Sequence, residues 1–443
     1  MATTIPEVAE ALSTVLTATA DEAAYDTKFV QRRSKLTGSI FVQTLTFGWL
    51  AKPHATLEEL SQTAATLGVR VTPQGLDQRF TPRAAACLQK VLEAAVRRVL
   101  TADPVAIPVL QRFSGGVWLF DSTIIPLPDA LARLWPGCGR NQGPAQGGIK
   151  LQVCLDWLHG TLCGPLLQAG SAHDRLGILP TPCGSEGALH LADLGYFDLD
   201  RFQELSQQKH YWLTRVQINT RLYDAAGTKY TLPDLLAKAT TNRVDMPIAL
   251  GADHRLPARV VAVRVPAAVA AQRRKRMLKK ARKLGKKIDP GRWALAEWTV
   301  YATNIPDSIL QAQELLILAR CRWQIELLFK LWKSEGRIDE SRSDKPWRIL
   351  CEVYAKLLGM VIQHWILLIG CWSHADRSLV KASRSVRSHA LFLAAVFKVR
   401  HLVCNVLDII VRCLASGCRV NKRRKEPATH QLLLNFSQAR EAA

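Results

Sequence analysis

Residues 320–333 have the sequence RCRWQIELLFKLWK, in which four charged residues recur at helical spacing. Arg322, Glu326, Lys330 and Lys333 follow one another at intervals of four, four and three residues, which places them on one face of an α-helix. We expect the opposite face to pack in the core, with the apolar residues Trp323, Leu327, Leu328 and Leu331. The charged face permits two interpretations. It is either a solvated row of ion pairs, each worth only about 0.3–0.5 kcal/mol, or a metal-binding carboxylate beside three cations that bind phosphate.

Two other carboxylates follow short, mostly apolar segments. Residues 117–120 (VWLF) and 189–192 (LHLA) are each predicted to be a buried strand, and the next residues are Asp121 and Asp193. In α/β sheets the carboxyl ends of strands border the crevice that holds the chemistry. Converging carboxylates bind Mg²⁺, and two such ions about 4 Å apart promote phosphoryl transfer. A strand-end aspartate also serves as a helix cap or turn residue, so spacing alone leaves both roles open.

The chain carries a large excess of positive charge. Its 443 residues include 59 Lys and Arg against 37 Asp and Glu, a formal net charge of +22. Residues 273–287, RRKRMLKKARKLGKK, contain ten basic residues and no acid. A basic run can be a solvated helix face, but in a chain that is basic elsewhere it favours contact with nucleic acid phosphates. The expected contacts are Arg273, Arg274, Lys275, Arg276, Lys279 and Lys280. A second basic cluster consists of Arg419, Lys422, Arg423, Arg424 and Lys425.

Residues 1–105 are predicted to be helical. Thr56 and Glu59 form a capping box that opens one helix. Thr72, followed by a proline, opens a second helix over residues 72–80. Two helices joined by a short turn are the outline of a helix-turn-helix DNA-binding motif, although an ordinary helical bundle explains the pattern equally well. The side chains of the second helix that would read base edges are Gln74, Gln78 and Arg79.

The pattern changes near residue 106, where predicted strands and helices begin to alternate. We expect an α/β catalytic domain over residues 106–370, with a β-rich basic insertion at about 217–296. Residues 371–443 are expected to form a C-terminal helical region for dimerisation, with a basic tail. Together with residues 1–105, these make three consecutive domains, in line with about 150 residues per domain.

The composition argues against several classes of protein. Hydrophobic residues are 48% and charged residues 22%, which excludes global disorder. The apolar stretch 357–372 is interrupted by Gln363 and His364, so we expect a buried helix and no membrane partner. The N-terminus lacks the basic and apolar regions of a signal peptide.

The cysteine pattern predicts a reducing, cytoplasmic setting. There are 11 cysteines, an odd number, and no CxxC pair, which argues against a disulfide framework or a zinc finger. Cys154 and Cys321 lie in apolar patterns where a thiol acts as a small hydrophobic group. One catalytic or metal-bound cysteine is left open.

The spacing of Arg322, Glu326 and Lys333 resembles the signature helix of DDE transposases of the insertion-sequence-4 type. The family motif is Tyr, two residues, Arg, three residues, Glu, six residues, Lys. The segments that begin at Asp121 (DST) and at Asp193 (DLGYF), each after an apolar strand, resemble the family as well. The order of strand-Asp, strand-Asp, β insertion and helix-Glu is also that of the family. The resemblance covers residues 110–350 well and the N-terminal helices more loosely.

The resemblance implies an RNase H-like α/β core, flanked by an N-terminal helical DNA-binding domain and C-terminal helices. It implies that Asp121, Asp193 and Glu326 bind two Mg²⁺ ions, for which Mn²⁺ substitutes. Arg322 and Lys333 would hold phosphates at the transposon end. Lys330 would assist them.

The resemblance also implies a partner and a reaction. Members of the family cut double-stranded DNA at the inverted-repeat ends of an insertion sequence and join the 3′ ends to target DNA. They work as homodimers that bridge two ends. The resemblance also implies that the protein is bacterial, cytoplasmic and associated with the nucleoid. Trp298 resembles a family aromatic that stacks on a base flipped out of the duplex, and a core aromatic explains it equally well.

One position departs from the family motif. Ala319 stands where the family has tyrosine. The missing hydroxyl removes a hydrogen bond to phosphate, worth about 1.5–3 kcal/mol, but no metal ligand. Ala319 therefore supports an alternative, a catalytically silent DNA-binding protein derived from a transposase. A stand-alone RNase H-like nuclease, which would cut without strand transfer, is a third interpretation.

Overall fold

The computed structural model describes residues 2–32, 34–138, 146–174, 185–420 and 428–441. The chain forms two compact units, each assembled from segments that are distant in the sequence. Unit 1 consists of Met1–Ile107, Asp121–Pro182 and Trp323–His430, and unit 2 of Pro108–Phe120, Cys183–Arg322 and Gln431–Ala443. The units interleave along the chain, whereas the three domains expected from the sequence are consecutive. That domain division stays a prediction.

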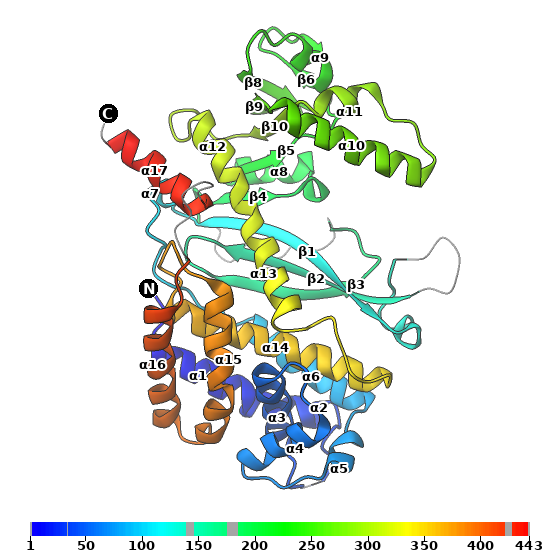
Figure 1. The fold of residues 1–443 in the computed structure, drawn as a ribbon, viewed down its shortest axis with the longest axis vertical. Helices are drawn as coiled ribbons and strands as arrows, with labels where there is room; N and C mark the ends of the chain where they lie inside the picture. Colours follow the sequence, from blue (N-terminus) through cyan, green and yellow to red (C-terminus); the bar gives the residue numbers. More distant parts are fainter. Residues whose placement is uncertain (1, 33, 139–145, 175–184, 421–427, 442–443) are drawn as a thin grey trace. The chain divides into compact units, whose positions relative to one another are not determined.

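The helices of unit 1 come from both ends of the chain (Figure 1). They are α1 (Ile5–Leu16), α2 (Ala18–Asp26), α3 (Gly38–Ala51), α4 (Leu57–Thr66), α5 (Pro73–Asp77), α6 (Pro82–Val96), α13 (Trp323–Ser334), α14 (Pro346–Gly370), α15 (Leu379–Val396) and α16 (Arg400–Gly417). α14 packs on α3, α6 and α16, and α15 packs on α3 and α16. The N-terminal helices thus share a core with the C-terminal ones, which favours the helical bundle for residues 1–105.

α5 is shorter than the sequence suggests. Thr72 caps it as expected, but the helix ends at Asp77 and does not continue to residue 80. Thr81 then caps α6, and Pro82 lies in the first turn of that helix. A proline disfavours helical backbone at the preceding residue, so the start of α6 limits the length of α5.

α14 is the core helix of unit 1. It is long and apolar enough to cross a membrane, but 94% of its most apolar window is buried inside the protein. Its polar residues have internal partners. His364 Nε2 donates to the carbonyl oxygen of Gly160 at 2.7 Å, and Lys356 pairs with Glu352 at 2.7 Å. Burial with hydrogen-bonded polar side chains is the behaviour expected of a core helix, although Nδ1 of His364 has no hydrogen-bond partner among the described residues.

Unit 1 contains one edge of the sheet. Its strands are the second part of β1 (Val117–Leu127), β2 (Gly147–Asp156) and β3 (Leu162–Ala169), and the short 3-10 helix η1 (Asp129–Leu131) follows β1. β2 lies between β1 and β3 and pairs antiparallel with β3. Every residue of β2 is buried.

Unit 2 contains the remaining strands, in the order β1-β4-β5-β10-β9-β8-β6-β7. They are β4 (Leu189–Ala192), β5 (Tyr211–Arg215), β6 (Leu222–Tyr223), β7 (Lys229–Tyr230), β8 (Arg243–Leu250), β9 (Leu256–Arg264) and β10 (Trp298–Thr303). β1, β4 and β5 run parallel, and β10 is antiparallel to β5 and β9. The helices are α7 (Pro108–Gln111), η3 (Leu194–Tyr196), α8 (Leu199–Gln207), α9 (Leu232–Ala237), α10 (Ala267–Leu284), α11 (Pro290–Leu295), α12 (Ala312–Leu318), η4 (Ala319–Arg322) and most of α17 (Thr429–Glu441).

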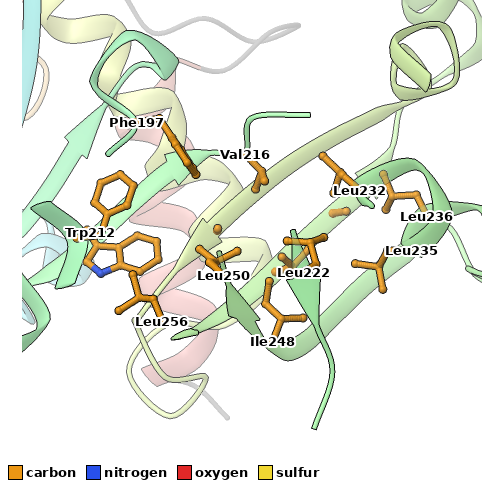
Figure 2. Close-up of a cluster of buried hydrophobic side chains, with 14 of the residues drawn as sticks. Phe197, Trp212, Val216, Leu222, Leu232, Leu235, Leu236, Ile248, Leu250 and Leu256 are labelled. Atoms are coloured by element: carbon orange, nitrogen blue, oxygen red, sulfur yellow. The ribbon is translucent and has the colours of Figure 1, made fainter. Parts of the chain in front are cut away.

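The expected β-rich insertion lies between β5 and β10. It comprises β6 to β9 with α9, α10 and α11, and the basic run forms most of α10. Leu222, Leu235 and Ile248 from the insertion pack with Trp212 of β5 in one hydrophobic cluster (Figure 2). The insertion is therefore anchored to the central strands of unit 2. The mixed α/β architecture with a large sheet confirms the predicted fold class.

Candidate active site and nucleic-acid interface

Asp121 and Asp193, the two aspartates predicted at strand ends, adjoin the paired segment of two neighbouring parallel strands. β1 and β4 pair in register from Val117 with Leu189 to Phe120 with Ala192. Asp121 and Asp193 are the next residues of these strands, and both are half-buried. Asp193 directly follows β4, as predicted, but the prediction that the strand from Val117 ends at Asp121 was wrong, because β1 continues through Asp121 to Leu127.

The helix that carries Glu326 begins immediately after a contact with β4. η4 ends at Arg322 and packs on β4, the strand that precedes Asp193. α13 then begins at Trp323, so Glu326 lies in its first turn and is half-buried. Asp121 and Glu326 belong to unit 1, and Asp193 and Arg322 belong to unit 2.

The C-terminal part of α13 contacts β1. Lys333 Nζ donates to the carbonyl oxygen of Ile124 at 3.2 Å, three residues beyond Asp121. Lys330, one turn earlier on α13, is exposed. Within unit 1 the structure therefore brings the helix of Glu326 against the strand of Asp121, with cations on the same helix.

The apolar face of α13 is rotated from the expected one. Leu328 and Leu331 are buried as predicted, but Trp323 is 55% exposed and Leu327 36% exposed. The prediction that these two residues pack in the core was wrong. The buried stripe instead consists mainly of Ile325, Leu328, Phe329 and Trp332. These positions are three or four residues apart and form one continuous helical face.

A polar network adjoins Asp121 in unit 1. The backbone N–H of Ser122 donates to Asp121 Oδ1 at 2.8 Å, and the Ser122 hydroxyl donates to Asp174 Oδ1 at 2.8 Å. Lys150 Nζ lies 2.9 Å from the same Asp174 oxygen. Burial raises the pKa of Asp174, but the hydrogen bonds from Lys150 and Ser122 outweigh burial and hold that pKa below its ordinary value. Asp174 was not identified from the sequence as part of the site. The polar residues Lys150 and Gln152 in an otherwise apolar strand indicated that a buried polar partner was present.

A second interaction of α13 was also missed. Glu335, just after the helix, accepts hydrogen bonds from Arg384 Nη2 at 2.7 Å and from Arg387 Nη1 at 3.1 Å. Both arginines belong to α15. The hydrogen bond and charge of Arg384 lower the pKa of Glu335 despite burial, so the carboxylate stays ionised. The end of α13 is thereby fixed to α15.

The donor chemistry of the three carboxylates suits a hard metal ion. Among the described residues, no three His, Cys, Asp or Glu side chains are grouped closely enough to hold a metal. Asp121, Asp193 and Glu326 nevertheless provide carboxylate oxygens, the ligands that Mg²⁺ prefers. All three are half-buried, so each retains access to solvent. Their chemistry and exposure fit such an ion.

Three of the described cysteines are unsuited to act as a competing nucleophile. They are free thiols, as expected. Burial raises the pKa of Cys154, Cys321 and Cys351 well above the ordinary value. Because the thiolate is the reactive form, these three are structural residues.

The basic residues of α10 fall into two groups. Arg273 donates to the carbonyl oxygen of Trp298 at 2.8 Å and to Thr299 Oγ1 at 2.9 Å, and Arg274 pairs with Glu297 at 2.7 Å. These two arginines hold α10 to the strand β10 and to the residue before it. The other four predicted DNA contacts are all exposed: Lys275, Arg276, Lys279 and Lys280.

A hollow of about 500 Å³ lies at the C-terminal end of α10. Its apolar lining includes Leu278 and Trp293, and its cations are Arg282, Lys286 and Lys287. Gly285 ends the helix in the left-handed conformation, with φ 59°. Basic and apolar groups thus continue beyond the residues predicted to contact DNA.

Trp298 lies in the hydrophobic core of unit 2. It is 6% exposed and belongs to the cluster around Trp212. The Arg264 guanidinium lies 4.8 Å from the centre of its ring. These contacts favour the core role that the sequence left open beside base stacking.

The residues predicted to read bases lie in or just after α5, a short helix that forms an ion pair with another segment of unit 1. Gln74 and Gln78 are exposed, whereas Arg79 is half-buried and, like Gln78, lies beyond the end of α5. Asp77 of α5 pairs with Lys345, just before α14. In the second basic cluster, Arg419 pairs with Asp376 at 2.8 Å, and the lysines and arginines of 422–425 lie outside the described residues.

Comparison with known proteins assigns the family. A sequence model of the family described as "Transposase DDE domain" matches residues 112–362. The transposase for insertion sequence element IS231F of Bacillus thuringiensis subsp. israelensis is 26% identical over 367 residues, covering 77% of this chain and 76% of that protein. The transposase for IS1151 of Clostridium perfringens is 24% identical, covering 78% and 77%. The putative transposase InsL for IS186A of Escherichia coli (strain K12) is 31% identical over 103 residues, covering 23% and 28%. Since the family model spans more than half of the chain and the α/β core agrees with an RNase H-like catalytic domain, the chain belongs to the DDE transposase family of the insertion-sequence-4 type.

Proposed function

We propose that this transposase binds the inverted-repeat ends of its own insertion sequence, cleaves the DNA there by metal-dependent hydrolysis and joins the 3′ ends to target DNA. Relatives are named as transposases for insertion sequence elements. The observation that carries the proposal is the parallel register of Phe120 with Ala192, because the next residues are Asp121 and Asp193. The contact of η4 with β4 is a second support, because η4 ends at Arg322 and Glu326 follows in the first turn of the next helix, α13.

Asp121, Asp193 and Glu326 would hold two Mg²⁺ ions, for which Mn²⁺ substitutes. When bound, such a pair activates a water or hydroxyl nucleophile and stabilises the leaving oxygen. Three carboxylates would offset most of the charge of the two ions and leave coordination positions for phosphate oxygens and water.

The reaction consists of two phosphoryl transfers. Water attacks the phosphorus at the end of the element, the bond from phosphorus to the 3′ oxygen breaks, and a free 3′ hydroxyl and a 5′ phosphate result. The 3′ hydroxyl, after loss of its proton, then attacks a target phosphodiester and displaces the 3′ oxygen of the target strand. One phosphodiester bond forms and one breaks in the second step. No covalent intermediate with the protein and no external energy source are required.

Cations of α13 would orient the DNA phosphates. Lys330 and Lys333 follow Glu326 on α13, and Arg322 precedes it in the chain as the last residue of η4, so basic residues flank the carboxylate in sequence. The exposed residues of α10 would supply further backbone contacts, with Lys279 and Lys280 central among them. Phosphate contacts of this kind position a protein on DNA without reading the sequence.

We further propose that the protein acts as a homodimer that bridges two transposon ends. It would do so in the bacterial cytoplasm, associated with the nucleoid. The C-terminal helices carry apolar side chains that pairing would cover, including Leu391 at 45% and Phe392 at 49% exposure. No membrane partner is proposed.

The test uses plasmid DNA that carries the coding region with its natural flanks. Purified wild-type protein and Glu326→Gln are incubated with it and Mg²⁺, and breaks are mapped to the nucleotide. Glu186→Gln, at an exposed glutamate of unit 2, is the matched control. The proposal predicts breaks at two inverted ends for wild type and control and none for Glu326→Gln, with DNA binding retained in all three. Binding at those ends without breaks in any protein, even with Mn²⁺, would establish the silent DNA-binding protein and overturn the proposal.

A further inference from the structure

We propose that Ser122, Asp174 and Lys150 position the carboxylate of Asp121 and are required for metal binding there. This inference rests on the proposed function, since it assigns Asp121 a metal. The three residues come from three separate segments of unit 1. Ser122 is on β1, Lys150 is on β2, and Asp174 follows β3.

The network reaches Asp121 through the backbone of β1. Successive side chains of a strand point to opposite faces, so the Ser122 hydroxyl bonds Asp174 on the face of β1 opposite to Asp121. The Ser122 N–H, in contrast, donates to Asp121 Oδ1 at 2.8 Å. Ser122 therefore connects the two faces. Its hydroxyl is fixed on one side at 2.8 Å from Asp174, and its amide orients the carboxylate on the other.

The far end of the network is anchored in the interior. The Lys150 side chain is 9% exposed, and its ammonium pairs with Asp174 and donates to the carbonyl oxygen of Ala172. Gln152, two residues along β2, donates to the carbonyl oxygen of Asp174 at 3.1 Å. Asp174 is thus held by its side chain and by its backbone, so it presents one fixed oxygen to Ser122.

Stability alone does not explain this arrangement. Every residue of β2 is buried, and apolar side chains at positions 150 and 152 would pack there without the cost of desolvating a charge. An ion pair between the buried Lys150 and the half-buried Asp174 gains little stability but fixes geometry. Because it holds the residue next to Asp121, the position that it fixes is that of the proposed metal ligand.

The inference predicts an effect on metal binding that a structural role alone would not produce. Residues that hydrogen-bond to a metal ligand without touching the metal typically contribute about 10–100-fold to metal affinity or activity. Ser122→Ala keeps the backbone N–H but removes the hydroxyl, and Asp174→Asn removes the charge that Lys150 neutralises. Both variants should bind Mn²⁺ at least about tenfold more weakly and lower kcat for cleavage, with KM for the DNA end unchanged.

The experiment measures Mn²⁺ binding by electron paramagnetic resonance on the full-length protein with bound end DNA, together with cleavage rates and thermal unfolding. Ser122→Thr keeps a hydroxyl and should rescue Mn²⁺ affinity and kcat. Ser171→Ala is the matched control, because Ser171 lies in the same segment as Asp174 but bonds the carbonyl oxygen of Pro136. It should behave as wild type.

Three results would overturn the inference. One is wild-type Mn²⁺ affinity and kcat in Ser122→Ala and Asp174→Asn. Another is equal loss in Ser122→Thr and Ser122→Ala. The last is a change confined to the unfolding temperature. If wild type cuts and Glu326→Gln does not, these results overturn the inference alone. A wild-type protein that neither cuts nor binds Mn²⁺ overturns the proposed function and this inference with it.

Discussion

Phe120 of β1 and Ala192 of β4 are direct partners in a parallel register. The residue after each is an aspartate: Asp193 follows the end of β4, and Asp121 lies in β1 just beyond its pairing with β4. Each aspartate is therefore adjacent in the chain to a residue of the paired segment of β1 and β4.

DNA binding by α10 should depend on its exposed lysines. Lys279→Gln combined with Lys280→Gln removes two charges, and each lost phosphate contact reduces the slope of log K against log salt by about 0.9. The double variant should bind end DNA more weakly and with a slope smaller by up to about 1.8. A salt titration followed by fluorescence anisotropy measures this. Lys209→Gln with Lys229→Gln, at exposed lysines of unit 2 outside α10, is the control for net charge. Equal effects of the two double variants would show that net charge, and not α10, determines binding.

Arg273 should contribute to stability and not to the salt dependence. Its guanidinium donates to the carbonyl oxygen of Trp298 and to Thr299 Oγ1. Hydrogen bonds of a charged group are worth about 1.5–3 kcal/mol, so Arg273→Gln should lower the free energy of unfolding by about that amount. Denaturant unfolding measures the loss, and the salt slope for DNA should stay at the wild-type value. A wild-type stability with a reduced slope would mean that Arg273 contacts DNA instead.

Stability should fall as the pH is lowered from about 6.5, the ordinary pKa of histidine. Burial lowers the pKa of His190 to about 3 and that of His364 to about 4. Between these values and 6.5 the unfolded chain binds protons that the folded protein does not. The stabilisation is therefore complete above pH 6.5 and is lost as the pH falls, by up to about 1.4 kcal/mol per pH unit for each histidine.

Denaturant unfolding at pH values from 8 to 4.5 checks this prediction, because carboxylates with lowered pKa contribute mainly below that range. His364→Gln keeps a donor for the carbonyl oxygen of Gly160 and should flatten the dependence relative to wild type. Identical slopes for the two proteins would contradict the assignment to His364.

Local signals in the sequence were sufficient for the helix starts and the strands of the site. The capping box is present, since Glu59 Oε2 accepts from the N–H of Thr56 at 2.8 Å. Both apolar runs are in strands, as predicted, but only the run before Asp193 ends where the sequence indicated, since β1 continues past Asp121 to Leu127.

Features that depend on tertiary contacts could not be predicted in the same way. Trp323 was assigned to the wrong face of α13, because the sequence supports two apolar stripes and only packing selects one of them. In α10 the sequence does not distinguish Arg273 from Lys275, although one is bonded to β10 and the other is exposed. Asp174 is 52 residues from Ser122 in the chain, so only the folded sheet brings the two together.

The central claim is that Asp121, Asp193 and Glu326 together hold the metal. Iron-mediated cleavage tests it most directly, because Fe²⁺ in a Mg²⁺ site, with ascorbate and peroxide, generates radicals that cut the adjacent backbone. The full-length protein with bound end DNA is treated in this way, and the fragments are identified by mass spectrometry. We expect cuts in three regions, around residues 121, 193 and 326, suppressed by excess Mg²⁺ and lost in Glu326→Gln. Cuts at other positions that Mg²⁺ suppresses, with none in these three regions, would contradict the claim.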